Sequence, residues 1–228
     1  MEDKKRPGVF WAHMDAGAKR PATLNFVPGS TVYNEQIIIK GSSEFRIWDP
    51  YRSKLAAALL KGLEAFAFVP GASVLYLGAS SGTTASHVSD LIDSEGRVYC
   101  VEFAPRMMRE LVPVCAIRKN MIPIMADARY PESYIQIPEM VDVLYQDVAQ
   151  PNQAKILVQN AKRFLRSGGT AYVAIKARSI DVAAKPTRIF SREEKTLAQS
   201  EFTVVDRFSL DPFSADHVFL SAIYGESE

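Results

Sequence analysis

From about residue 51 onward, short apolar runs alternate with stretches that have the periodicity of helices. The runs expected to form strands are residues 73–77, 97–102, 121–125, 141–145 and 169–176. The expected helices are residues 51–63, 83–93, 106–117 and 153–166, and a last one that Ser191 opens through a capping box with Glu194. Apolar strands that alternate with helices are typical of a mainly parallel sheet covered on both faces. The pattern therefore predicts an α/β fold with a doubly wound sheet.

The two ends of the chain depart from this alternation. Only about eight residues separate the last two apolar runs, 202–208 and 217–222, too few for a helical crossover, so these strands must pair antiparallel. Before residue 50 the pattern is one of short strands, with 36–40 and 45–48 flanking a Gly41 turn. Weaker strand candidates there are residues 9–14 and 24–27. We expect a small β-rich amino-terminal module at 1–50 and a larger domain at 51–228.

The charge balance and the two cysteines narrow the classes of function. Lys and Arg number 27 and Asp and Glu 26, so a role on nucleic acid needs a local basic patch or a partner's charge. Cys100 and Cys115 lie outside any CxxC motif, so we expect buried reduced thiols and no metal site. The uncharged segment 65–86 is interrupted by glycines and a proline, which argues against a membrane span. A cytoplasmic protein with no membrane attachment is expected.

Polar side chains follow four of the expected parallel strands. Glu102, Asp127, Asp147 and Lys176 each stand at or just after a strand end, and a Gly78–Gly82 turn follows residues 73–77. Ligands of open α/β sheets bind at the carboxyl ends of the strands, so these residues predict a lined crevice. The turn has neither the P-loop pattern nor a third glycine, which disfavours nucleoside triphosphates and NAD(P). A sulfonium nucleoside needs no diphosphate cradle, so S-adenosylmethionine (SAM) is the favoured ligand.

Several longer motifs resemble those of the fibrillarin family in its archaeal type. The stretches are YLGASSGTTASHVSD, YCVEFAPRMMRELVPVC, DVAQPNQAKILVQNAKRFL, AIKARSID and DHVFL. The resemblance covers nearly the whole chain and implies a Rossmann-like SAM-dependent methyltransferase fold. It further implies an enzyme that methylates ribose 2′-hydroxyls of rRNA and tRNA within a box C/D guide ribonucleoprotein. The implied partners are a Nop-type scaffold protein, a guide RNA and a kink-turn-binding protein.

The same resemblance assigns site residues. The implied SAM contacts are Gly78, Ala79, Thr83, Thr84, Glu102, Phe103, Asp127, Ala128, Asp147, Val148, Ala149 and Gln150. The implied catalytic set is Lys54, Asp147, Lys176 and His217, with Lys40 as the competing first lysine. From the residue types we expect Lys176 to act as the general base, kept partly neutral by the Lys54 cation, and Asp147 to orient it.

Other functions stay open at this point. One is a SAM-dependent methyltransferase of a protein or a small molecule, and another is an NAD(P)-dependent oxidoreductase. A third is a ribonucleoprotein subunit without catalytic activity, against which the Asp147 and Lys176 placement argues. Six cations on neighbouring segments are candidates for the border of the active-site mouth: Arg163, Arg166, Arg178, Lys185, Arg188 and Arg192.

Overall fold

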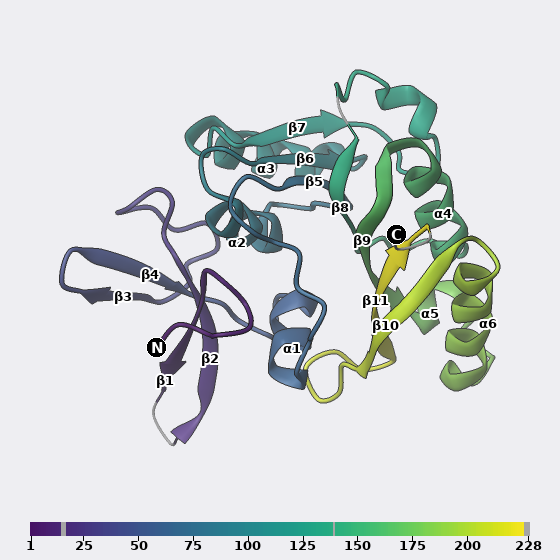
Figure 1. Ribbon diagram of the computed structural model, residues 1–228, viewed down its shortest axis with the longest axis horizontal. Helices are drawn as coiled ribbons and strands as arrows, with labels where there is room; N and C mark the ends of the chain where they lie inside the picture. The colour runs from purple at the N-terminus through teal and green to yellow at the C-terminus, as the bar shows by residue number, and fades with distance from the viewer. Residues whose placement is uncertain (15–16, 139, 226–228) are drawn as a thin grey trace.

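The computed structural model describes residues 1–14, 17–138 and 140–225, whose strands form two sheets (Figure 1). The smaller sheet is antiparallel, in the order β1-β2-β4-β3. Its strands are β1 (Val9–His13), β2 (Lys19–Leu24), β3 (Ile37–Lys40) and β4 (Ser43–Ile47). The larger sheet has the order β10-β11-β9-β8-β5-β6-β7. Its strands are β5 (Ser73–Leu77), β6 (Arg97–Glu102), β7 (Met121–Met125), β8 (Val141–Gln146), β9 (Leu165–Lys176), β10 (Phe202–Ser209) and β11 (His217–Tyr224).

Helices cover both faces of the larger sheet. On one face lie α1 (Lys54–Lys61), α2 (Thr83–Ile92) and α3 (Pro105–Ile117). On the other lie α4 (Gln153–Phe164), α6 (Pro186–Ala198) and the 3-10 turn η2 (Pro131–Tyr134), and the short α5 (Ala177–Ile180) follows β9. Val74 and Tyr76 of β5 pack into the first core, whereas Leu75 and Leu77 pack into the second. Burial on both faces explains why these strands are continuously apolar, and it confirms the α/β expectation.

The order of the strands reverses direction at β5. This strand pairs in parallel with β6 on one side and with β8 on the other, and β8 pairs in parallel with β9. β11 runs antiparallel to both β9 and β10, as the short connection between the last two strands requires. The carboxyl ends of β5 and β8 therefore meet at the point where an open sheet leaves a crevice.

Several local expectations are corrected. Residues 24–27 are not a strand, because β2 ends at Leu24; its Pro21 is tolerated because β4 pairs with β2 only from Ala22 onward. The expected helix 106–117 is α3, which contains Pro113 and continues to Ile117. Ser191 does not open α6, because Pro186 begins the helix and Ile189 already packs in the core.

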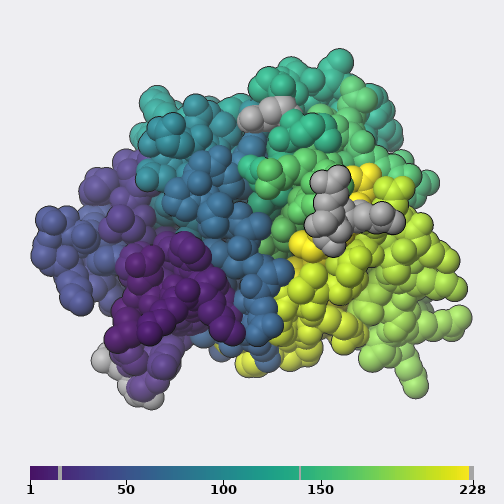
Figure 2. Space-filling model, viewed as in Figure 1, coloured from purple at the N-terminus to yellow at the C-terminus, as the bar shows by residue number. Residues whose placement is uncertain are grey.

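The amino-terminal module is joined to α2 by a buried polar network. Arg46 of β4 donates to Glu35 at 2.6 Å and to Asp90 of α2 at 2.8 Å. Asp90 also accepts from Arg118, which follows α3, at 2.5 Å. His87 of α2 stacks on Trp48 with ring centroids 4.6 Å apart and bonds to the hydroxyls of Thr23 and Tyr33 at 2.7 and 2.8 Å. Figure 2 shows the module packed directly against the rest of the molecule.

This network makes stability depend on pH. Burial, reinforced by the charges of Arg46 and Arg118, holds the pKa of His87 well below its ordinary 6.5. The folded protein keeps His87 neutral, whereas the unfolded chain takes up a proton at this residue below pH 6.5. We expect His87 to leave the free energy of unfolding unchanged above pH 6.5. As the pH is lowered from 6.5, the free energy of unfolding should decrease by up to about 1.4 kcal/mol per pH unit. Urea unfolding between pH 7.5 and 5.0 measures this slope.

The control for that slope is the exposed His13 of β1. His13→Gln should keep the wild-type slope, and His87→Gln should reduce it. A His87 ring that titrates near pH 6.5 in the folded protein, followed by NMR, would contradict the explanation whether or not the variant folds.

In the part of the chain that the structure describes, no helix combines the length and the apolar character needed to cross a bilayer.

Candidate active site

A cleft of about 210 Å³ lies at the carboxyl ends of β5, β6, β7 and β8. It is lined by Gly78, Ser80, Val101, Glu102, Phe103, Ala126, Asp127, Ala128, Asp147, Val148, Ala149 and Gln150. Nine of these residues belong to the SAM-contact set expected from the sequence, so the structure brings most of that set together. The expected crevice at the switch in strand order is present.

Three residues of the expected set do not line the cleft. Ala79 and Thr84 are buried, and Thr83 begins α2. The Thr84 hydroxyl donates to the Ser53 hydroxyl at 2.9 Å, and Ser53 in turn caps α1 by accepting from the Ala56 amide. Thr84 thus supports the start of the helix whose first residue is Lys54.

Three lining residues were missed by the sequence reasoning: Ser80, Val101 and Ala126. Val101 and Ala126 directly precede Glu102 and Asp127, so a search widened by one residue at each strand end would have found them. Ser80 lies inside the expected turn, between Ala79 and Thr83, but was not assigned a contact of its own.

The turn after β5 is shaped by two glycines. Gly78 has φ 82°, and a Cβ there would collide with the carbonyl oxygen of Asp147. Gly82 has φ 90° and precedes α2, whose start has no side-chain cap. Both positions favour glycine, because side chains rarely adopt positive φ. The turn lies against the end of β8, and the first amides of α2 are available for an anionic group.

Two carboxylates organise the loops around the cleft. Glu102 is buried, and its oxygens accept from the amides of Ser80 and Ala104, both at 2.8 Å. It therefore ties the turn after β5 to the turn after β6. Asp127 pairs with Arg129 at 2.6 Å, and this guanidinium hydrogen bond holds the pKa of Asp127 below its usual value.

The negative charge of the residues that line the cleft limits which classes of ligand can bind there. Glu102, Asp127 and Asp147 line the cleft, and no Lys or Arg is among its described lining residues. A cationic or hydroxyl-rich ligand gains from such a surface, whereas a diphosphate would be repelled by it. These carboxylates, which accept hydrogen bonds and attract a cation, fit an adenosyl sulfonium better than NAD(P).

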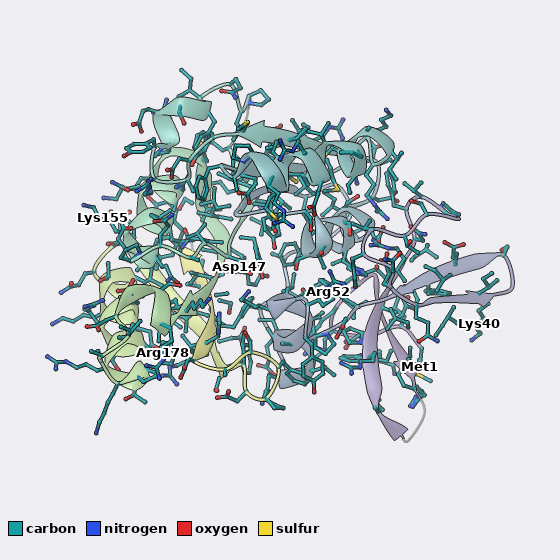
Figure 3. All side chains as sticks on the ribbon, turned by 180° about the vertical axis from the view of Figure 1, so that it is seen from behind. Met1, Lys40, Arg52, Asp147, Lys155 and Arg178 are labelled. Carbon is teal, nitrogen blue, oxygen red and sulfur yellow. The ribbon has the colours of Figure 1, made fainter. Side chains whose placement is uncertain are left out.

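Lys54 and Asp147 form an ion pair beside the cleft. The Lys54 Nζ lies 2.7 Å from Asp147 Oδ2, and both side chains are 26% exposed. Ser53 caps α1 and directs its first residue, Lys54, toward the end of β8. Lys40 ends β3 and stands on the hairpin away from Asp147 (Figure 3). The geometry favours Lys54 over Lys40 as the partner of Asp147.

Lys176 and His217 lie next to each other on adjacent strands. They are paired residues in the antiparallel register of β9 and β11, so their side chains share one face of the sheet. Buried Gln153 fixes this end of β9, since its side chain accepts from the Lys176 amide at 2.9 Å and donates to the Lys176 carbonyl at 3.2 Å. Sequence reasoning used Gln153 only as a helix start and missed this positioning role.

The pKa of His217 is influenced by the other three residues expected to be catalytic. Burial and then the charges of Lys54 and Lys176 lower the pKa of His217, against the opposing effects of its hydrogen bond with Ala215 and of the Asp147 carboxylate. The Nδ1 atom lies 2.7 Å from the Ala215 carbonyl, which requires a donor at Nδ1. Neutral His217 therefore presents Nε2 as a hydrogen-bond acceptor. The other three residues expected to be catalytic, Lys54, Asp147 and Lys176, all lie within electrostatic reach of His217.

The expected basic border of the active-site mouth is only partly supported. Arg166 pairs at 3.0 Å with Asp142, the second residue of β8, and therefore lies at the opposite edge of the sheet from Asp147. Arg163 lies near the carboxyl end of α4, at that same edge. Arg178 pairs with Asp216, next to His217, and stays near the site. The periodicity of α4 in the sequence predicted a helix but not which of its ends lies near the cleft, so Arg163 and Arg166 were placed at the wrong end.

Comparison with known proteins shows the family of this chain. The family model described as Fibrillarin matches residues 1–226. The fibrillarin-like rRNA/tRNA 2′-O-methyltransferase of Methanopyrus kandleri is 52% identical over 217 residues, which are 95% of this chain and 94% of that protein.

Two solved structures resemble the chain throughout. Aeropyrum pernix fibrillarin, in complex with natively bound S-adenosyl-L-methionine, has a TM-score of 0.90 at 51% identity and covers 97% of this chain and 96% of its own. A fibrillarin in a fibrillarin/Nop5p complex has a TM-score of 0.85 at 38% identity, with coverage of 96% and 98%. Matches of this extent, in sequence and in fold, show that the chain belongs to the fibrillarin family.

Proposed function

We propose that this protein is a SAM-dependent RNA ribose 2′-O-methyltransferase that acts on rRNA and tRNA. In this proposal it is the catalytic subunit of a box C/D guide ribonucleoprotein, held by a Nop-type scaffold protein beside a guide RNA and a kink-turn-binding protein. The names of the relatives and the SAM and Nop5p complexes of family members support it. The observation that carries it is the Lys54–Asp147 pair, adjacent to Lys176 and His217, at the rim of an acidic cleft.

The cleft offers a suitable partner for each part of SAM. Glu102 would accept hydrogen bonds from the ribose hydroxyls, with Phe103 beside it. Asp127 and Ala128 would contact the adenine. Residues 147–150 would line the sulfonium side, where the Asp147 carboxylate favours a cation. Gly78 and Ala79 shape the turn, and the start of α2 at Thr83 and Thr84 would receive the carboxylate of the methionine part. When bound, SAM supplies a methyl group already activated by its positive sulfur.

The chain's own residues have the remaining tasks, which are alignment and the removal of one proton. Lys176, as the neutral amine, would take the proton of the ribose 2′-hydroxyl. Asp147 holds Lys54 and faces the same cluster, so it would orient the amine. Nε2 of His217 would accept a hydrogen bond from the ribose. Lys54 would attract the neighbouring phosphate.

Two further assignments belong to this proposal. Residues 51–228 would form the methyltransferase domain, and residues 1–50 an amino-terminal module that supports it through the Arg46–Asp90 network. We also propose a cytoplasmic location, because rRNA and tRNA of the kind named for the relatives are used there.

Methyl transfer in a reconstituted particle tests the function. With tritium-labelled SAM, scaffold, kink-turn protein and guide RNA, we expect label in the guide-paired RNA at one nucleotide. A target with 2′-deoxyribose at that nucleotide should accept none. Label in the deoxy target, or in protein, would favour a methyltransferase with another acceptor, and binding of NADH in place of SAM in calorimetry would favour an oxidoreductase.

The isolated protein should bind RNA weakly. A net charge of +1 provides little attraction for phosphates, so we expect binding that weakens steeply with salt and methylation well below that of the particle. Filter binding and methyl transfer at 50 and 200 mM salt measure both. Robust, salt-insensitive methylation of free RNA would contradict the need for a guide particle.

A further inference from the structure

A second hollow, of about 310 Å³, lies where the amino-terminal module meets the residues that lead into α1. Its lining includes Arg20, Tyr33, Asn34, Asp49, Tyr51 and Arg52. None of these residues was assigned a role by the sequence motifs. The hollow combines flat aromatic rings with guanidinium groups, which are the side chains that bind unpaired nucleotides.

Each arginine of the hollow lies against a tyrosine ring. Arg20 lies 5.4 Å from the centre of the Tyr51 ring, and its ion pair with Asp49 is 3.7 Å long. Arg52 lies 5.0 Å from the centre of the Tyr33 ring and donates to the Tyr33 carbonyl at 3.3 Å. Among residues 1–14, 17–138 and 140–225, Arg52 forms no ion pair, and the side chain is exposed. Its charge is therefore available to an anion.

The hollow adjoins the catalytic cluster through two segments. Arg52 precedes Lys54 by two residues, a span of at most about 7 Å. Tyr51 is 59% exposed, and its ring lies 5.2 Å from the ring of Phe213, in the loop that leads to His217. The segments that place Lys54 and His217 thus also border the hollow.

We propose that this hollow holds the substrate RNA strand next to the methylated nucleotide, with a base on Tyr51 and a phosphate at Arg52. The inference rests on the proposed function, because it needs a polynucleotide whose target ribose lies at Asp147. Stacked nucleotides follow one another about every 3.4 Å, so a neighbour of the target comes within reach of Tyr51. We call Tyr51 and Arg52 together the platform. It would position the target ribose without contacting SAM.

Kinetics of Tyr51 variants test the platform. In the complete particle, Tyr51→Ala should raise KM for the target RNA about tenfold, leave kcat within about threefold, and leave SAM affinity unchanged. Tyr51→Phe keeps the ring and should match the wild type. Unchanged KM for Tyr51→Ala would overturn the proposal, whereas wild-type particles without methyl transfer would instead refute the proposed function.

Salt dependence and crosslinking give independent readouts. Arg52→Ala should reduce the slope of log KM against log salt by about one, and Arg52→Lys should keep it. The matched control is Arg109→Ala, an exposed arginine on α3. With wild-type protein, 4-thiouridine on either side of the target nucleotide should crosslink to the peptide that contains Tyr51 and Arg52. Crosslinks confined to other peptides would overturn the proposal, even if the variants do not fold.

Discussion

Lys176→Ala is expected to lower the single-turnover rate of RNA methylation by about 10²- to 10⁴-fold, the usual contribution of a general base. Lys176 ends β9 opposite His217. The other amine of the cluster, that of Lys54, is engaged in the ion pair with Asp147, so Lys176 is the amine left to take the proton. It does not line the SAM cleft, and the affinity for SAM should stay within about twofold of the wild type. Rapid-quench methylation and calorimetry measure the two quantities.

Two further variants make that result specific. Lys176→Arg keeps the positive charge but cannot lose its proton, so it should be as inactive as the alanine variant. Lys119→Ala removes an exposed lysine that follows α3, at the opposite edge of the sheet, and should behave as wild type. An active Lys176→Arg enzyme would show that the residue contributes charge and no proton transfer.

Asp90→Ala is expected to destabilise the protein by about 3–5 kcal/mol, because it leaves two buried arginines without this carboxylate. The Asp90 side chain is fully buried and accepts from Arg46, Arg118 and Thr23 at 2.8, 2.5 and 2.6 Å. Glu35 is the other acid on Arg46, whereas Asp90 is the carboxylate that pairs with both guanidinium groups. Urea unfolding followed by circular dichroism at pH 7.5 gives the difference in free energy.

The comparison variant is Glu95→Ala, which removes an exposed carboxylate after the same helix. It should change the free energy of unfolding by less than about 0.5 kcal/mol. A loss below about 1 kcal/mol for Asp90→Ala would mean that water or a rearranged Glu35 compensates the two arginines. The network would then not be what joins the amino-terminal module to α2.

Local pattern was sufficient for the elements whose sequence and packing agree. The apolar runs at 73–77 and 97–102 became β5 and β6 with unchanged bounds, because a strand buried on both faces is apolar throughout. The start of α6 was predicted wrongly, because there the local pattern and the packing disagree. Ser191 and Glu194 read locally as a capping box, but Glu194 pairs with Arg207 of β10 at 2.5 Å. Tertiary contacts there outweigh the capping preference.

The sequence alone determined the fold class, the family resemblance and the strand-end placement of Glu102, Asp127, Asp147 and Lys176, because periodicity and motif order are properties of the chain itself. Only the tertiary structure decided that Lys54, and not Lys40, reaches Asp147, since 93 residues separate that pair along the chain. The same is true of the Arg46–Asp90–Arg118 network and of Tyr51 beside Phe213. Contacts between distant segments depend on how helices and strands pack, and no local pattern specifies them.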